Sequence, residues 1–312
     1  MPSENKPLVL IVGPTAVGKT ALSLALAQRF GGEIVSADSR QIYQGMDIGT
    51  AKATPEERAL VPHHLLDIAS PDEWYTVAQF QDAAMQAIGE IHARGRLPFL
   101  VGGSGLYVRA VAEGLQIPRI PPSPELRAAL EAQAAADPDA LAERLRALDP
   151  DAADRIDPRN VRRVIRALEV CLLAGQPISE QQTRQPPPLR CLWIGLTLPR
   201  PELYGRIDER VDRMIASGLV DEVRALAARG YAWDAPAMTG VGYRQIGTYL
   251  RGESSLEEAV REIKRATRRF VRQQSNWFRL DDARIHWLHS DAQVERIAAE
   301  LIQSFLDSEC AK

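Results

Sequence analysis

Cysteine is scarce in this chain. Cys171, Cys191 and Cys310 are the three cysteines among 312 residues, and no C-x-x-C pair occurs. An odd number of widely spaced cysteines disfavours both a disulfide framework and a structural zinc site. The N-terminal residues lack a signal-peptide pattern, and no apolar stretch approaches the ~18 residues of a membrane span. These absences predict a protein of the reducing cytoplasm that has no membrane partner.

Neither sign of charge dominates the chain. It has 38 Lys and Arg against 41 Asp and Glu, which gives a formal net charge of −3. Overall charge therefore does not indicate a nucleic-acid partner, so local clusters have to be considered. The 45% hydrophobic content is enough for one large domain or for a core with an insertion.

Residues 13–20 form a complete G-x-x-x-x-G-K-[ST] phosphate-binding loop. It follows an apolar strand pattern at 8–12 and precedes a helix pattern at 21–27, which is the order the motif requires. Backbone N–H groups and the helix N-terminus can hold phosphate oxygens, Lys19 adds a charge, and Thr20 offers a hydroxyl to a magnesium ion. The pattern predicts a phosphorylated ligand, without deciding whether that ligand is a nucleotide.

The order of elements predicts an α/β fold with a doubly wound parallel sheet and a helical insertion. Strand patterns at 33–37 and 97–101 and a helix pattern at 77–94 alternate within the first 115 residues. From 116 to 189 the sequence is rich in Ala, Leu, Arg and Glu and has no strand signal. We therefore expect a core of residues 1–115 and 190–312 with a helical C-terminal part, and an insertion at 116–189.

The strands after the insertion and near the C-terminus complete this prediction. Residues 191–196 read as a returning strand, and 284–288 as a late one, within an otherwise helical remainder. Asp38 ends the second strand, at the sheet edge where ligands bind in such folds. It could be a magnesium ligand, a general base or a helix cap.

The strand at 97–101 ends without a second aspartate. Gly102-Gly103-Ser104-Gly105 follows it, which disfavours ATP hydrolysis. Small residues here leave room for a substrate to approach the backbone, although a tight turn is the simpler interpretation.

Two arginine-rich runs suggest a polyanion. One holds Arg155, Arg159, Arg162, Arg163 and Arg166; the other runs from Arg261 to Arg272 and is followed by Trp277-Phe278-Arg279. Each run alone is typical of a solvated helix face, and Trp277-Phe278 of a buried pair. Together, beside a phosphate loop, they favour several contacts to a nucleic-acid backbone and stacking on bases. Arg206, Arg210 and Arg213 share a helix face with acidic residues, which favours ion pairs for most of them.

Two functions fit these features. A phosphate-loop small-molecule kinase would use Asp38 to activate a hydroxyl and the insertion as a lid. The other is a non-catalytic RNA-binding protein that uses a nucleotide as a switch.

The chain resembles the bacterial tRNA dimethylallyltransferases (tRNA isopentenyltransferases) over nearly its whole length. The blocks that carry the resemblance are Gly13–Thr20, Asp38–Tyr43, His63–Asp67, Gly102–Tyr107, Asn160–Glu169, Gly218–Val223, Val241–Ile246 and Arg272–Arg279. Where the family usually has Thr in the Gly-Gly-Thr-Gly-Leu-Tyr block, this chain has Ser104. The resemblance implies transfer of a dimethylallyl group from dimethylallyl diphosphate to N6 of adenosine 37, in the anticodon loop of tRNAs that read codons beginning with U.

The resemblance also implies a set of site residues. We expect Asp38 as the base, Ser104 beside it, and Arg210 at the departing diphosphate. The donor diphosphate is expected at Gly13, Thr15, Ala16, Val17, Gly18, Lys19, Thr20 and Arg166, with Mg²⁺ on Thr20. The tRNA anticodon stem-loop is expected at Asp38, Ser39, Arg40, Gln41, Arg162, Arg163, Val164, Ile165, Arg166, Arg244, Gln245, Arg272, Gln274 and Trp277. We expect the insertion to contact tRNA and the protein to act as a monomer.

Overall fold

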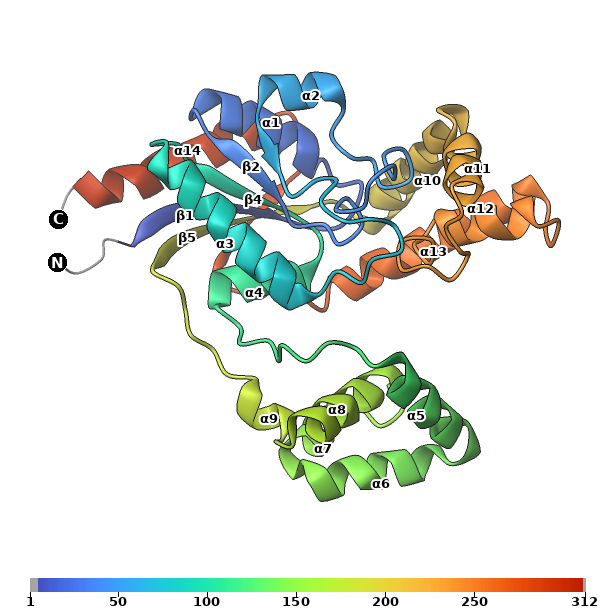
Figure 1. Cartoon of the computed structure of the whole chain (residues 1–312). Helices are drawn as coiled ribbons and strands as arrows, with labels where there is room; N and C mark the ends of the chain where they lie inside the picture. Colours follow the sequence, from blue (N-terminus) through green and yellow to red (C-terminus); the bar gives the residue numbers. More distant parts are fainter. Residues whose placement is uncertain (1–4, 311–312) are drawn as a thin grey trace. The chain divides into compact units, whose positions relative to one another are not determined.

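The computed structural model describes residues 5–310. Within them, parallel strands form one sheet with the order β3-β2-β4-β1-β5-β6 (Figure 1). The strands are β1 (Lys6–Val12), β2 (Glu33–Ser36), β3 (His63–His64), β4 (Pro98–Gly102), β5 (Leu189–Thr197) and β6 (Ile285–His289). The predicted α/β fold with a phosphate-loop core is confirmed.

Strand β1 lies at the centre of the sheet and is buried on both faces, as its unbroken apolar sequence requires. Val9 and Ile11 pack into one hydrophobic cluster, and Leu8, Leu10 and Val12 into another on the opposite face. The first cluster is covered by α1 (Lys19–Arg29) and α14 (Val294–Cys310), and the second by α3 (Val77–Ala93) and α4 (Gly105–Glu113) (Figure 1). The sheet is therefore the middle layer of three.

Helices near the carboxyl ends of the strands form a third cluster. They are α10 (Arg200–Ala216), α11 (Leu219–Ala228), α12 (Tyr243–Leu250) and α13 (Leu256–Gln274). Their buried side chains pack with Ile42, Tyr43 and Met46, from the segment that follows β2. A capping box of Ser255 and Glu258 begins α13. The short α2 (Pro55–Leu60) also begins at a capping box, formed by Thr54 and Glu57.

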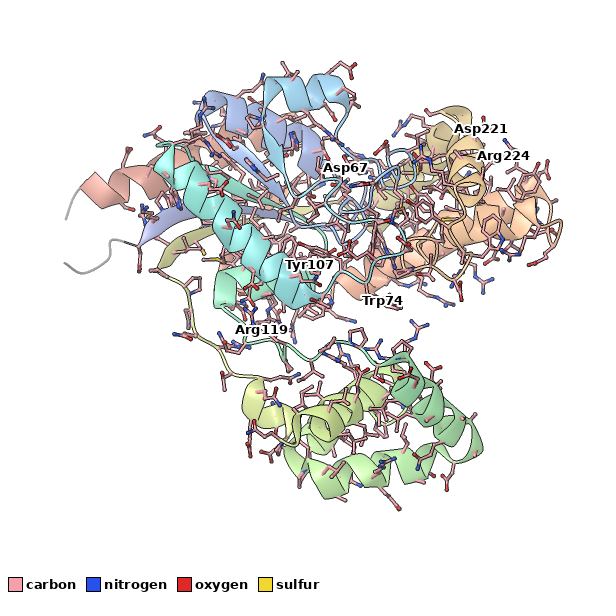
Figure 2. All side chains as sticks on the ribbon, in the orientation of Figure 1. Asp67, Trp74, Tyr107, Arg119, Asp221 and Arg224 are labelled. Atoms are coloured by element: carbon pink, nitrogen blue, oxygen red, sulfur yellow. The ribbon has the colours of Figure 1, made fainter. Side chains whose placement is uncertain are left out.

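The chain divides into two compact units. One contains the residues up to Ala112 and those from Pro188 on; the other is Glu113–Pro187. The second unit has its own core and consists of α5 (Pro124–Ala136), α6 (Pro138–Leu148), α7 (Pro150–Arg155), α8 (Val161–Ala174) and α9 (Ile178–Gln181). Figure 2 shows the side chains of both units.

The helices of the second unit begin where the sequence dictates. Ser123, Asp137 and Asp149 each cap a helix, and each is followed by a proline at the first helical position. Among residues 5–310, no helix combines the length and apolar character needed to cross a bilayer.

Candidate active site

The phosphate-binding loop connects β1 to α1 with the backbone that the motif requires. Gly13 has φ 141° and Gly18 has φ 105°, both in the region that favours glycine. A Cβ on Gly13 would also lie 2.6 Å from the Leu196 carbonyl oxygen. The Lys19 Nζ donates to the carbonyls of Gly13 (3.1 Å) and Pro14 (2.8 Å). The lysine therefore lies across the loop that it serves.

Lys19 is electrostatically coupled to two predicted catalytic residues. Burial lowers the pKa of the Lys19 ammonium to about 8; Asp38 acts in the opposite direction, and Arg210 adds to the decrease. Burial also lowers the pKa of Arg210, again with Asp38 opposing. The Asp38 carboxylate therefore lies close enough to both cations to influence their pKa values.

Asp38 and Ser104 are connected through Ser39, which follows Asp38 in the chain and bonds the Ser104 hydroxyl. The Asp38 Oδ1 accepts the Arg40 N–H at 2.8 Å within a turn, and because no helix begins here, Asp38 is not a helix cap. Ser104 Oγ accepts the Ser39 N–H at 3.0 Å. Ser104 also donates to Ser39 Oγ at 3.3 Å. The Ser104 hydroxyl thus holds the turn that presents the Asp38 carboxylate.

Two cavities lie beside Asp38, which lines both of them. A polar cavity of about 520 Å³ is lined by the phosphate-binding loop, and a second of about 260 Å³ has an apolar wall. Residues lining the first include Lys19, Thr20, Gln41, Arg206 and Arg213. Residues lining the second include Ile207, Met214, Val241, Ile263 and Phe270. Both are lined by Thr15, Asp38, Thr50 and Arg210.

The loop at 46–52 forms part of both cavity walls, and sequence reasoning missed it. Arg210 donates to the Thr50 carbonyl at 3.3 Å. The Gln41 side-chain amide donates to the Thr50 and Ala51 carbonyls, and its oxygen accepts from the Ser36 hydroxyl. The side-chain amide of Gln41, which was predicted to contact tRNA, is therefore hydrogen-bonded within the protein.

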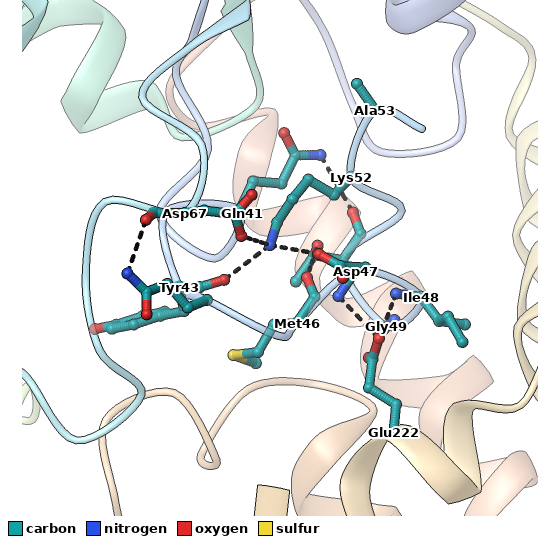
Figure 3. Close-up of polar contacts among 12 residues, drawn as sticks. Gln41, Tyr43, Met46, Asp47, Ile48, Gly49, Lys52, Ala53, Asp67 and Glu222 are labelled. Carbon is teal, nitrogen blue, oxygen red and sulfur yellow. Dashed lines mark hydrogen bonds and ion pairs between the residues drawn. The ribbon is translucent and has the colours of Figure 1, made fainter. Parts of the chain in front are cut away.

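A buried lysine fixes this 46–52 loop (Figure 3). The Lys52 Nζ has no exposed side-chain surface and contacts Asp47 (2.7 Å), Asp67 (2.6 Å) and the Tyr43 carbonyl (2.8 Å). From α11, Glu222 accepts the N–H groups of residues 47, 48 and 49. No local sequence pattern marks Glu222 as a partner of this loop, because 173 to 175 residues separate it from the N–H groups that it accepts.

The Gly102–Gly105 loop corrects one expectation. Its missing side chains make room for the protein rather than for a substrate. A Cβ on Gly102 would lie 2.1 Å from the Ala37 carbonyl oxygen. A Cβ on Gly103 would lie 2.3 Å from Gln274, and one on Gly105 would lie 2.3 Å from Trp277.

The predicted tRNA residues differ in accessibility. Arg162, Arg163, Arg244 and Arg272 are exposed, and Arg40 donates to the Pro236 carbonyl. Gln245 is buried and accepts the Gly242 N–H at the start of α12. Gln274 is buried at the end of α13. The exposed arginines keep the charge that a tRNA backbone requires.

The predicted residues of α8 belong to the second unit. Val164 and Ile165 are buried in its core. The Arg166 guanidinium bonds the buried carboxylate of Glu169 at 2.5 Å and the Ile120 carbonyl at 2.9 Å. Among these residues, Arg162 and Arg163 are the ones whose side chains are exposed.

The arginines of α10 pair less than the sequence suggested. Arg206 bonds Glu202 at 2.9 Å. The acidic neighbours Asp208 and Asp212 pair instead with Arg268 and Lys264 of α13. Arg206, Arg210 and Arg213 all line the polar cavity, so this helix face contributes positive charge to the site.

Comparison with known families agrees with the geometry. The sequence model of the family described as IPP transferase matches residues 41–281, and that of Isopentenyl transferase matches residues 6–67. A tRNA dimethylallyltransferase of Roseiflexus sp. (strain RS-1) is 56% identical over 304 residues, 97% of this chain and 99% of that protein. One from Thermomicrobium roseum is 58% identical over 278 residues, 89% of this chain and 84% of that protein.

Solved structures give the same result. The tRNA isopentenylpyrophosphate transferase of Bacillus halodurans is 44% identical with a TM-score of 0.71, over 98% of this chain and 99% of its own. A eukaryotic dimethylallyltransferase described as acting on tRNA is 27% identical with a TM-score of 0.83, over 97% of this chain and 80% of its own. With most of its length matched at more than half identity, this chain belongs to the tRNA dimethylallyltransferase family.

Proposed function

We propose that this enzyme transfers a dimethylallyl group from dimethylallyl diphosphate to N6 of adenosine 37, in the anticodon loop of tRNAs that read codons beginning with U. One observation carries the proposal. Asp38 and Arg210 line both the polar cavity beside the phosphate-binding loop and the apolar-walled cavity. A donor in the first cavity and an adenine in the second would face each other across these two side chains.

The residues supply each part of the reaction. The N6–C1 bond forms as the C1–O bond to the diphosphate breaks, and the N6 proton passes to the Asp38 carboxylate. Lys19, Arg210 and the loop amides from Ala16 to Thr20 stabilise the charge that collects on the leaving diphosphate. Ser104 orients Asp38 through Ser39.

The adenine has to leave the anticodon stack to reach Asp38. The apolar wall formed by Met214, Val241 and Phe270 suits a flat base and an isoprenoid. Exposed arginines on α8 and α13 suit the tRNA backbone, so the Glu113–Pro187 unit would contact tRNA through its α8 arginines. We propose that the enzyme acts as a monomer in the cytoplasm.

A magnesium ion fits the polar cavity through Thr20. The Thr20 side chain lines that cavity together with Asp38. Within the described part of the chain, no group of three His, Cys, Asp or Glu residues could hold a metal. Mg²⁺ bound to phosphates keeps several waters and needs few protein oxygens, which this site can supply. When bound, the ion would neutralise charge on the diphosphate.

The deciding experiment supplies labelled dimethylallyl diphosphate or labelled ATP, with and without tRNA. Label passing from the diphosphate to tRNA supports the proposal, whereas phosphate passing from ATP to a small molecule would indicate a kinase. Asp38→Ala should abolish transfer while tRNA still binds. Near-normal turnover in this variant would remove Asp38 as the base.

A further inference from the structure

The side chain of Gln274 joins two loops of the donor site. It stands at the last position of α13 and is 5% exposed. Its Oε1 accepts the Thr15 N–H of the phosphate-binding loop at 3.0 Å. Its Nε2 donates to the Gly103 carbonyl at 2.9 Å. Both ends of one amide are thus bonded to backbone groups that follow two neighbouring strands, β1 and β4.

The loop after β4 is shaped to receive this side chain. A Cβ on Gly103 would lie 2.3 Å from the Gln274 Nε2, and one on Gly105 would lie 2.3 Å from Trp277. Two glycines therefore accommodate the last residue of α13 and Trp277, which follows that helix. A side chain at either position would displace its partner.

The Gly103 contact leads directly to the predicted base. Ser104 follows Gly103 in the chain, and its hydroxyl accepts the Ser39 N–H. Ser39 in turn follows Asp38. The Gln274 amide therefore contacts both sides of the proposed reaction site. It bonds Thr15 in the loop that would hold the diphosphate, and through Gly103 and Ser104 it acts on the turn that presents Asp38 to the acceptor.

We propose that Gln274 is a positioning residue that fixes the phosphate-binding loop against the Gly102–Gly105 loop. This inference rests on the proposed function for its meaning in catalysis, and it replaces a tRNA contact as the role of Gln274. While Gln274 accepts the Thr15 N–H, that amide is not available to a phosphate oxygen. The leaving diphosphate is then held by the later amides of the loop, from Ala16 to Thr20.

The test compares Gln274→Met with Gln273→Met. Methionine has a similar length but provides neither bond, and Gln273 is the exposed neighbour on the same helix. Affinity for inorganic diphosphate with Mg²⁺ is measured by calorimetry, and affinity for unmodified tRNA by filter binding. We expect Gln274→Met to weaken diphosphate binding by about tenfold, the equivalent of one or two hydrogen bonds, with tRNA affinity within about twofold of wild type. Gln273→Met should match wild type in both.

A second variant perturbs the contact from the other side. Gly103→Ala should displace the Gln274 amide without altering α13, and it should reproduce the loss of diphosphate affinity. In Gln274→Met, the Thr15 amide should also exchange its hydrogen faster than in wild type. Unchanged diphosphate affinity in both variants would overturn the proposal, as would an equal loss of tRNA affinity. Diphosphate binding needs no transfer reaction, so this outcome is separable from failure of the proposed function.

Discussion

The Tyr243 hydroxyl donates to the Glu222 carboxylate at 2.5 Å, and the same carboxylate caps the backbone of the 46–52 loop. Burial and the Glu222 charge raise the pKa of Tyr243 well above its usual range, so the phenol stays protonated and donates. Tyr243 and Gly49 are in close contact, since a Cβ on Gly49 would lie 2.5 Å from the tyrosine ring. One carboxylate thus joins two segments that line the same cavity.

Removal of the Glu222 carboxylate should therefore destabilise the cavity wall formed by the 46–52 loop and Tyr243. In Glu222→Ala, three N–H groups lose their acceptor, and we expect the free energy of unfolding to fall by about 2–4 kcal/mol. Tyr243→Phe should cost about 1 kcal/mol, because only one hydrogen bond is lost. Urea denaturation measures the free energy of unfolding of both variants, and steady-state kinetics measures their kcat/KM for the donor.

The neighbouring Asp221 provides the matched control. It is exposed on α11 and pairs with Arg224 one turn away (Figure 2). Asp221→Ala should change the free energy of unfolding by less than about 0.5 kcal/mol. If Asp221→Ala were as damaging as Glu222→Ala, the carboxylate clamp on the 46–52 loop would not be the cause.

Donor binding should weaken as the pH rises through about 8. The Lys19 pKa is lowered to about 8, so its ammonium is charged at pH 6.5 and mostly neutral at pH 9. If only the charged form binds, affinity for dimethylallyl diphosphate should fall about tenfold between these values. Lys19→Arg keeps its charge throughout and should lose this dependence, even if it binds less tightly. An unchanged profile in that variant would assign the titration to another group.

For catalysis, the hydroxyl at position 104 should matter more than the size of the side chain. Ser104→Ala leaves the Ser39 N–H without its acceptor, and we expect kcat to fall by about tenfold. Ser104→Thr restores the residue usual in the family and keeps the hydroxyl, so it should equal or exceed wild type. Single-turnover rates with saturating tRNA measure this. Equal rates for Ser, Thr and Ala would show that the hydroxyl is idle.

The exposed arginines of α8 should contribute through charge. The double variant Arg162→Ala/Arg163→Ala should weaken tRNA binding and lower the slope of log affinity against log salt by about 1–2. Donor affinity should remain that of wild type. Arg144→Ala, an exposed arginine on α6 of the same unit, serves as the control. A slope that is equal in both variants would place the phosphate contacts elsewhere.

Local patterns were enough to predict every strand of the described sheet except β3. The apolar runs at 8–12 and 191–196 became β1 and β5, because a strand buried on both faces has a distinctive composition. The two-residue strand β3 is too short for any periodicity. The small residues at 102–105 mark a real feature, but Ala37, Gln274 and Trp277 occupy the space that the glycines leave.

The support of the site was beyond sequence reasoning. Glu222 and Gln274 each act on backbone groups of distant segments, and such pairings leave no spacing in the sequence. The block containing Glu222 was recognised only as part of a family resemblance. Asp38, Lys19 and Arg210 were predictable because the motif, the strand end and the resemblance point to them separately, and all three line the polar cavity.

The order of strands has a consequence for synthesis of the protein. Residues Lys6 to Val12 of β1 pair with Leu189 to Gly195 of β5, and the whole Glu113–Pro187 unit is translated between them. During translation, β1 can pair with β4 on one side, while its other edge has no partner strand until β5 has been made. An open apolar edge invites association with other chains. On the ribosome, pairing of β1 with β5 therefore competes with association between neighbouring chains.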